Sequence, residues 1–352
     1  MTGFVTGSAG RLTLRKLVVV LAVSAGLTAL IAALAPLLGV VGDRAGWHLD
    51  IMGAGAFDAR SPEHAILWVR IPRVLAALIV GAALAGAGCA LQALLRNPLA
   101  EPFTLGISSG ASLAAVLAIR LGLESTFGVA GVGGAALLGA AGTLVIVWRL
   151  ARVGDHLPPA TLVLAGVTMS MFCSSASVLI QYTSDFTEVS HMLQWMLGGM
   201  ETVRLVTVGY AALPIGLALI GLLAHARELN ALAAGPEVAA SLGVAVGRTQ
   251  TVIFATASLL VGAAIAVVGP IGFIGLIVPH ALRALLGPDH RLLLPASMFG
   301  GASVLALCDT LARTVVPLHH LPTGAVTAVL GVPFFVMILL GHKQRAALWG
   351  RA

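Results

Sequence analysis

Apolar runs of roughly the length that crosses a membrane recur along almost the whole chain, and they limit the fold more than any other feature. A helix needs about 20 apolar residues to cross the hydrocarbon core of a bilayer. Lipid offers no hydrogen bonds to the backbone, so such a chain spans as helices or as a closed barrel. The runs are continuous rather than alternating, which favours helices. The sequence therefore predicts an all-α polytopic membrane protein.

The composition excludes a soluble globular protein. Of the 352 residues 59% are hydrophobic and only 10% are charged, whereas soluble domains carry about 25% charged residues. A basic balance would suggest nucleic acid as a partner of a soluble protein, but here we interpret the Lys and Arg residues as topology signals and expect no nucleic acid. Cys89, Cys173 and Cys308 lie inside apolar runs and predict neither a disulfide framework nor a metal site.

About ten spans are predicted, within a single transmembrane domain covering residues 1–352 whose helical bundle runs from 17 to 341. The first run is too long for the 7–15 apolar residues of a signal peptide, so we interpret it as an uncleaved span. The expected spans are residues 17–41, 74–95, 104–121, 127–148, 161–182, 205–223, 251–268, 271–286, 292–315 and 323–340.

The distribution of basic residues predicts the orientation. With both termini inside, the cytoplasmic segments hold 13 of the 20 Lys and Arg residues, and the outer segments hold 9 of the 14 acids. Because Lys and Arg are enriched in cytoplasmic loops, we expect the N-terminus and the C-terminus to be cytoplasmic.

The chain carries no recognisable source of energy for transport. No glycine-rich loop ending in Gly-Lys-Ser/Thr occurs, so no ATP site of the P-loop kind is expected. Ion-coupled carriers place ionisable residues in their spans, and here Asp309 is the main one. Arg313 follows four residues later, which predicts a local ion pair on one helix. This pattern favours a permease driven by a separate ATPase. An ion-coupled secondary transporter is the alternative, and a membrane enzyme would need a clustered site that is not found.

The longest inner loop, residues 225–249, predicts a short amphipathic helix. Pro236 and Glu237 suit the start of a helix and Gly243 suits its end, while Val238, Ala239 and Leu242 supply apolar side chains. Such a helix either lies on the lipid surface or contacts a partner protein.

Motifs spread over some 270 residues carry a family resemblance. They begin with Arg-Ile-Pro-Arg at 70–73 and Asn-Pro-Leu-Ala-Glu-Pro at 97–102, and they continue at 105–111, 164–167, 195–199, 269–280, 290–295, 321–324 and 331–335. In order and spacing the chain resembles the permeases of type II ABC importers, the FecCD family, which carry iron chelates, haem and cobalamin.

The resemblance implies the type II ABC importer permease fold and a set of partners. These are a second copy of the chain with the pathway along the dimer axis, two cytoplasmic ATP-binding subunits that hold ATP and Mg²⁺, and one periplasmic substrate-binding protein. No cofactor is expected on this chain, and the expected location is the bacterial inner membrane.

Three outer arginines, Arg70, Arg73 and Arg313, match family positions that meet acidic residues of the binding protein. The planar guanidinium suits carboxylates, and opposite charge steers association. The alternative is that these side chains only reach the membrane border and that Arg313 pairs with Asp309.

Two further sets of residues are implied by the resemblance. The coupling helix, which sits in a groove of the ATP-binding subunit, would comprise Pro236, Glu237, Ala239, Ala240, Leu242 and Gly243. A cytoplasmic gate would comprise Asn97, Pro98, Leu99, Ala160 and Thr161, although plain connectors between helices explain these segments equally well. Ala160 and its preceding proline stand where relatives often have hydroxyl residues.

The cargo is expected to be a metal chelate imported by alternating access. Haem is placed first, a siderophore second and cobalamin third, because a single self-pairing permease and some histidines on the outer side, including His319 and His320, favour haem. Adjacent histidines point apart on most backbones, so we interpret this pair as loop residues and expect no metal site.

Overall fold

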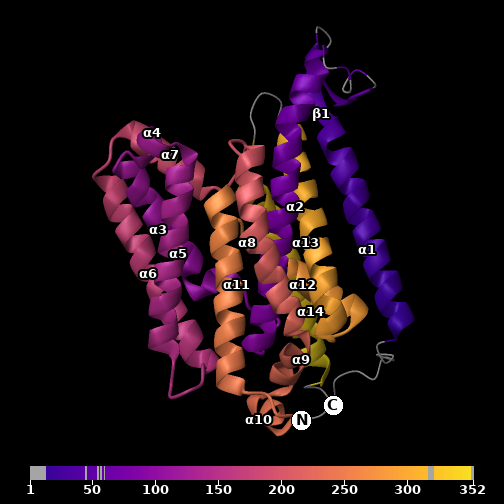
Figure 1. Ribbon diagram of the computed structural model, residues 1–352, viewed down its shortest axis with the longest axis vertical. Helices are drawn as coiled ribbons and strands as arrows, with labels where there is room; N and C mark the ends of the chain where they lie inside the picture. Colours follow the sequence, from indigo (N-terminus) through magenta and orange to yellow (C-terminus); the bar gives the residue numbers. More distant parts are fainter. Residues whose placement is uncertain are drawn as a thin grey trace.

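The computed structural model describes residues 13–43, 46–53, 55, 58, 60–315 and 321–349. His319 and His320 lie outside the described residues. Figure 1 shows an elongated bundle of helices with a small β-hairpin at one end. We refer to this as the hairpin end. The opposite end carries the short helices α9 and α10 and is called the α10 end (Figure 1).

Among the residues that the structure describes, ten main helices stand at the positions of the ten predicted spans. Seven of those in the described part of the chain are long and apolar enough to cross a membrane, and α3, α12 and the apolar part of α14 are shorter. Their bounds are α1 Leu14–Leu34, α2 Pro62–Leu94, α3 Ile107–Arg120, α5 Val129–Ala151, α6 Pro159–Tyr182, α8 Leu205–Ala224, α11 Val246–Val268, α12 Ile274–Leu286, α13 His290–Thr314 and α14 Thr323–Trp349.

Short helices connect the long ones. Helices α4 (Leu123–Phe127) and α7 (Phe186–Met196) lie toward the hairpin end, whereas α9 (Ala226–Ala234) and α10 (Pro236–Ser241) lie at the other (Figure 1). Two 3-10 turns, η1 (Ala35–Leu37) and η3 (Pro102–Leu105), follow α1 and precede α3. Helix α7 begins with a capping box, in which Asp185 accepts from the backbone of Glu188 and the Glu188 carboxylate accepts in return.

The expectation of an all-α chain was wrong between residues 38 and 51. There the strands β1 (Leu38–Asp43) and β2 (Gly46–Ile51) pair in antiparallel register, with Leu38 opposite Ile51. The predicted span 17–41 therefore ends early, at Leu34. Pro36 explains the stop, because proline lacks an amide donor and its ring disfavours a continuing helix. The β-branched pair Val40 and Val41 then favours a strand.

Helix α2 begins twelve residues before the predicted span, at Pro62. Ser61 is the N-cap and its hydroxyl accepts from the His64 amide at 3.1 Å, while Pro62 occupies the first turn. At about 1.5 Å per residue, its 33 residues extend for about 50 Å, well beyond the 30 Å core of a bilayer. As a result the Arg-Ile-Pro-Arg motif lies on a helix rather than in a loop.

Close backbone contact between α2 and its neighbours organises the centre of the bundle. Helix α2 packs on α13, α11 and α12. A side chain added at Gly81 would clash with the backbone of Gly301 on α13, and one at Gly88 would clash with Gly275 on α12. Small residues allow such approach in membrane proteins, where no hydrophobic force draws helices together.

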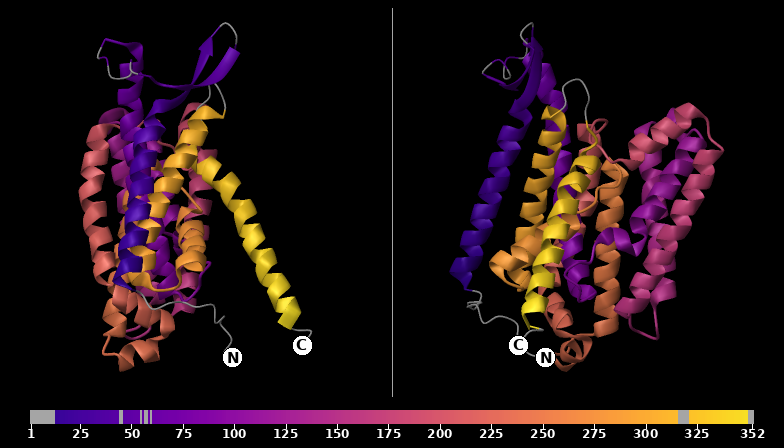
Figure 2. Two further views of the ribbon diagram at one scale, coloured as in Figure 1. Left: turned by 90° about the vertical axis from the view of Figure 1, so that its right-hand side faces the viewer. Right: turned by 180° about the vertical axis from the view of Figure 1, so that it is seen from behind.

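A second group of helices, α3, α5 and α6, packs together beside α11 (Figure 1). Helix α11 contacts both α2 and α5 and so joins the two groups. Helix α14 leaves the hairpin end next to α13 and diverges from the bundle toward its C-terminal end (Figure 2).

Candidate pathway, docking and coupling sites

A single carboxylate at the hairpin end ties three helices together. Asp309 on α13 is fully buried. It accepts from Nε of Arg73 on α2 at 2.7 Å, from Nε of Arg313 one turn further along α13 at 3.1 Å, and from the hydroxyl of Thr323 on α14 at 3.0 Å. We call these four residues the Asp309 cluster. The pairing of Asp309 with Arg313 that their spacing predicts is present.

The arginines also hold the segment that precedes the hairpin. Arg313 donates from Nη2 to the carbonyl of Ala35 at 3.1 Å. Arg70 donates from Nη1 to the carbonyls of Pro36 at 3.3 Å and Leu38 at 3.1 Å. The hairpin is thus fixed to α2 and α13 through guanidinium groups that satisfy backbone oxygens.

The three predicted docking arginines differ in access. Arg73 and Arg313 are only 6% and 8% exposed, whereas Arg70 is half-buried. Burying charges is costly unless they are paired, and the two buried guanidinium groups share one carboxylate here. Nη2 of Arg73 is buried without a hydrogen-bond partner among the described residues. The cluster therefore has an excess of positive charge with an unused donor, and docking by these residues stays a prediction.

At the α10 end, the predicted helix of the long loop is present as α10. It begins with Pro236 after Gly235, and Leu242 is its C-cap residue. Gly243 adopts a φ of 81°, which favours glycine. Ala239 is fully buried, whereas Val238 and Leu242 are 44% and 69% exposed. Pro236, Glu237 and Ala240 are also exposed. Apolar side chains therefore project from this helix away from the protein.

Sequence reasoning missed α9, which precedes α10 and lies against α2 and α13. Its Leu229 and Leu232 are buried. From this helix Asn230 reaches the start of α13, where its Oδ1 accepts from the His290 amide at 2.8 Å and its Nδ2 donates to Asp289 at 2.8 Å. No local pattern indicates this contact, because its partners are about 60 residues apart.

Asp289 is the N-cap of α13. Its carboxylate accepts from the amide of Arg291 at 3.1 Å and from Nη2 of the Arg291 guanidinium at 2.6 Å. These bonds from Arg291, with the one from Asn230, lower the pKa of Asp289 to about 2 against the cost of partial burial. The cap is therefore ionised at any physiological pH.

The predicted gate residues lie in two connectors at helix ends. After α2, Oδ1 of Asn97 accepts from the Leu99 amide at 3.0 Å, and Asn97 and Pro98 are exposed. At the start of α6, the Thr161 hydroxyl donates to the carbonyls of Ala151 and Pro158 at 2.8 and 2.9 Å. Ala160 is exposed. The hydroxyl of Thr161 thus joins α5 to α6, and gating by either connector stays a prediction.

Glu101 belongs to the motif at 97–102, but sequence reasoning gave it no role; it links the loop after α2 to the start of α12. Its Oε1 accepts from the amide of Phe273 at 2.5 Å. Phe273 has a φ of 70°, a rare conformation for a residue with a side chain. The carboxylate thus satisfies the amide of a residue held in a costly backbone conformation.

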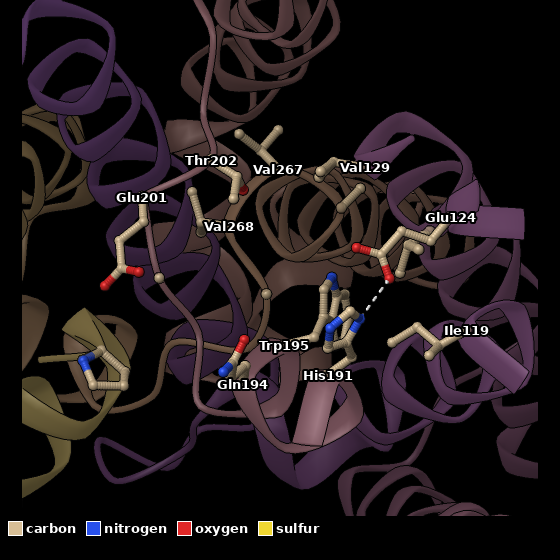
Figure 3. A pocket seen from close by; sticks show the side chains of 15 residues that line it. Ile119, Glu124, Val129, His191, Gln194, Trp195, Glu201, Thr202, Val267 and Val268 are labelled. Carbon is tan, nitrogen blue, oxygen red and sulfur yellow. Dashed lines mark hydrogen bonds and ion pairs between the residues drawn. The ribbon is translucent and has the colours of Figure 1, made fainter. Parts of the chain in front are cut away.

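A cavity of about 400 Å³ is lined by residues of α3, α4, α5, α7 and α11. Figure 3 shows its polar wall, where Nδ1 of His191 lies 3.3 Å from Oε2 of Glu124 and the indole of Trp195 lies beside them. Gln194 and Glu201 line the other side (Figure 3). Within the described ranges, no group of three or more His, Cys, Asp or Glu side chains is placed so that it could bind a metal ion.

The long apolar helices define a multi-pass membrane protein, and comparison with known proteins gives its family. The chain belongs to the FecCD transport family, which matches residues 27–341. It is therefore an ABC importer permease of that family, as its motifs predict.

The names of individual relatives mention different cargoes. The chain is 41% identical to the cobalamin import system permease protein BtuC of Halobacterium salinarum, over 79% of this chain and 74% of that protein. It is 39% identical to the hemin transport system permease protein HmuU of Yersinia pestis, over 80% and 85%. A solved structure described as an inward-facing metal-chelate type ABC transporter matches with a TM-score of 0.78 and 30% identity, over 91% of this chain and 98% of that one.

Proposed function

We propose that this chain is the membrane-spanning subunit of an importer that moves haem, or another metal chelate, into the cytoplasm by alternating access. The observation that carries the proposal is the exposed helix α10. Val238 and Leu242 project outward from it at an end of the bundle where the basic residues of the sequence gather. Exposed apolar side chains on a short helix are typical of a contact that a partner protein covers.

The proposed partners are two cytoplasmic ATP-binding subunits, each receiving the coupling helix of one permease in a homodimer. Residues 236–243 would transmit the movement of those subunits, which hold ATP and Mg²⁺ on their own chains. The divergence of α14 from the bundle supports the homodimer (Figure 2). Its apolar side chains Val329, Leu330 and Val332 are exposed in the single chain and are available for a second copy.

The hairpin end is proposed to face the periplasm and to receive the substrate-binding protein. Arg70 is the accessible member of the three arginines, with Arg73 and Arg313 behind it in the Asp309 cluster. A carboxylate of the binding protein would meet Arg70 first, and the excess positive charge of the cluster would strengthen that contact. The proposed location is the inner membrane of a bacterium.

The proposed gate and the path of the cargo follow from the same proposed orientation of the chain. The connectors with Asn97, Pro98 and Leu99 and with Ala160 and Thr161 lie at helix ends on the proposed cytoplasmic side, where they would close the pathway. This chain would contribute shape and movement and no bound cofactor.

The cargo is proposed in the order haem, siderophore, cobalamin. The relatives named for hemin and for cobalamin are almost equally similar to the chain, so the order rests on the sequence argument given above. The test is ATP hydrolysis by the reconstituted complex, measured with its binding protein loaded with haem or with cobalamin. Stimulation by the haem-loaded protein supports haem; stimulation by the cobalamin-loaded protein alone contradicts the choice of haem and keeps the importer.

A further inference from the structure

Asn230 connects the segment that carries the coupling helix to the first turn of α13. Its Oδ1 accepts two hydrogen bonds from His290, one from the backbone amide and one from Nδ1 of the ring, both at 2.8 Å. Its Nδ2 donates to Asp289 at 2.8 Å. The first amides of a helix have no partner within it, so a side chain from another helix here completes the start of α13.

The orientation of the Asn230 amide is set by its neighbours. If its oxygen and nitrogen were exchanged, the amide nitrogen would face the His290 N–H donor and the oxygen would face the Asp289 carboxylate. Both contacts would then be repulsive. Asn supplies an acceptor and a donor on one short side chain, and aspartate at 230 would supply acceptors only.

Helix α9, which carries Asn230, packs against the bundle, whereas most residues of α10 are exposed. Leu229 and Leu232 of α9 are buried, and α9 lies on both α2 and α13. Gly235 alone separates α9 from α10. Helix α10 also contacts α9 directly, so a displacement of α10 by a partner can pass to α9, one residue away.

We propose that Asn230 is a positioning residue for transport, because it transfers movement of the coupling helix α10 to the first turn of α13. The inference rests on the proposed function, since it takes α10 as the contact with the ATP-binding subunit. Pro295 lies one turn further along α13. It has no amide hydrogen, so it cannot donate to the carbonyl of Arg291. The first turn of α13 can thus tilt with α9 while the rest of α13 stays packed on α2.

Loss of the hydrogen bonds of Asn230 should uncouple ATP hydrolysis from cargo transport. The protein should stay folded, so neither activity should be lost through unfolding. The variants N230A, N230D and N230D/D289N would be reconstituted in liposomes with the ATP-binding subunit and binding protein. N230D places a second carboxylate 2.8 Å from Asp289, and D289N then returns a donor to face it. The quantity to measure is cargo imported per ATP hydrolysed, with the thermal unfolding midpoint of each variant recorded alongside.

We expect the ratio of import to hydrolysis to fall at least about fivefold in N230A, because one net hydrogen bond represents about that factor and the variant loses three. It should fall further in N230D and recover in part in N230D/D289N. R227Q is the matched control, because Arg227 is an exposed polar residue on the same helix; its ratio should not change.

An unchanged ratio in N230D, or an equal fall in R227Q, would overturn the proposal while leaving the importer intact. A fall in N230D that tracks the unfolding midpoint, with no recovery in the double variant, would also overturn it, because the residue would then be structural only. If the wild-type complex neither hydrolyses ATP nor imports, the proposed function fails and the inference falls with it.

Discussion

Asp309 is the residue on which the hairpin end depends, because it accepts from Arg73, Arg313 and Thr323 on three helices. Removing one member of a buried charge pair leaves the other charge uncompensated and costs about 3–5 kcal/mol. The spacing of Asp309 and Arg313 in the sequence predicts their pairing, but nothing in the sequence indicates Arg73 as a partner 236 residues away.

We expect D309N to lower the thermal unfolding midpoint of the detergent-solubilised protein substantially, because two buried guanidinium groups lose their carboxylate. E188Q is the comparison. It weakens the exposed pair between Glu188 and Arg120, and exposed pairs contribute about 0–1 kcal/mol. Equal midpoints for the two variants would show that the Asp309 cluster does not stabilise the fold.

The cap of α13 gives a prediction about pH. The pKa of Asp289 is lowered to about 2 in the folded protein, against about 3.9 for an unperturbed aspartate. The carboxylate therefore stabilises the fold above pH 4, and this stabilisation is lost as the pH falls toward 2. We expect the stability difference between the wild type and D289N to be constant from pH 5 to 8. A difference that already shrinks between pH 7 and 5 would contradict the lowered pKa.

At the scale of the elements, α2 approaches the backbones of α13 and α12 closely. We expect G81V to prevent correct assembly, because its side chain would collide with the backbone of Gly301. Gly142 on α5 has open space where the Cβ atom of a larger residue would stand. G142A should therefore raise stability by about 0.5–1 kcal/mol, since alanine suits a helix better than glycine. Monodispersity on size exclusion and the unfolding midpoint test both; a well-folded G81V would refute the close contact.

Helix α10 gives a prediction about assembly. The double variant V238S/L242S keeps the fold, because both side chains are exposed, but it should weaken copurification of the ATP-binding subunit. S241A on the same helix should leave copurification unchanged. Retention of the partner by V238S/L242S at wild-type level would argue that the helix only lies on the membrane.

The sequence predicted those elements whose start and end are marked by residues close together in the chain. Ten apolar runs led to ten helices, and Pro236, Glu237 and Gly243 placed α10 correctly. The end of the first run was missed because the apolar residues of β1 continue the pattern of α1, and only Pro36 marks the break. The start of α2 was missed because Arg70, Pro72 and Arg73 interrupt its apolar residues, so the predicted span begins only after them.

For the candidate sites, residues that act through distant partners escaped prediction. Asn230 lies in a predicted loop and Glu101 in a motif that suggested no contact for it, and their roles come from contacts with His290 and Phe273. Arg70 and Arg73 were expected at the surface, but the early start of α2 and the pairing with Asp309 bury Arg73. The spacing of Asp309 and Arg313 predicted their ion pair, but no local pattern predicted that Arg73 joins it or that the cluster is buried.

At the scale of the whole molecule, α13 spans the distance between the two proposed contact surfaces. Asn230 meets its first turn at the α10 end, and Asp309 lies 19 residues further along, about 29 Å away at 1.5 Å per residue. One helix thus carries both the contact to the coupling segment and the cluster behind the docking arginines. This arrangement links the sites that, in the proposed importer, face the ATP-binding subunit and the binding protein.

The most direct test of the importer is uptake of haem into liposomes that contain the permease with its ATP-binding subunit, with the loaded binding protein added to the face it docks on. We predict uptake that requires both ATP and the binding protein and that is unaffected when ion gradients are collapsed. Uptake that follows an imposed proton or sodium gradient in liposomes with the permease alone would contradict the account and identify an ion-coupled carrier.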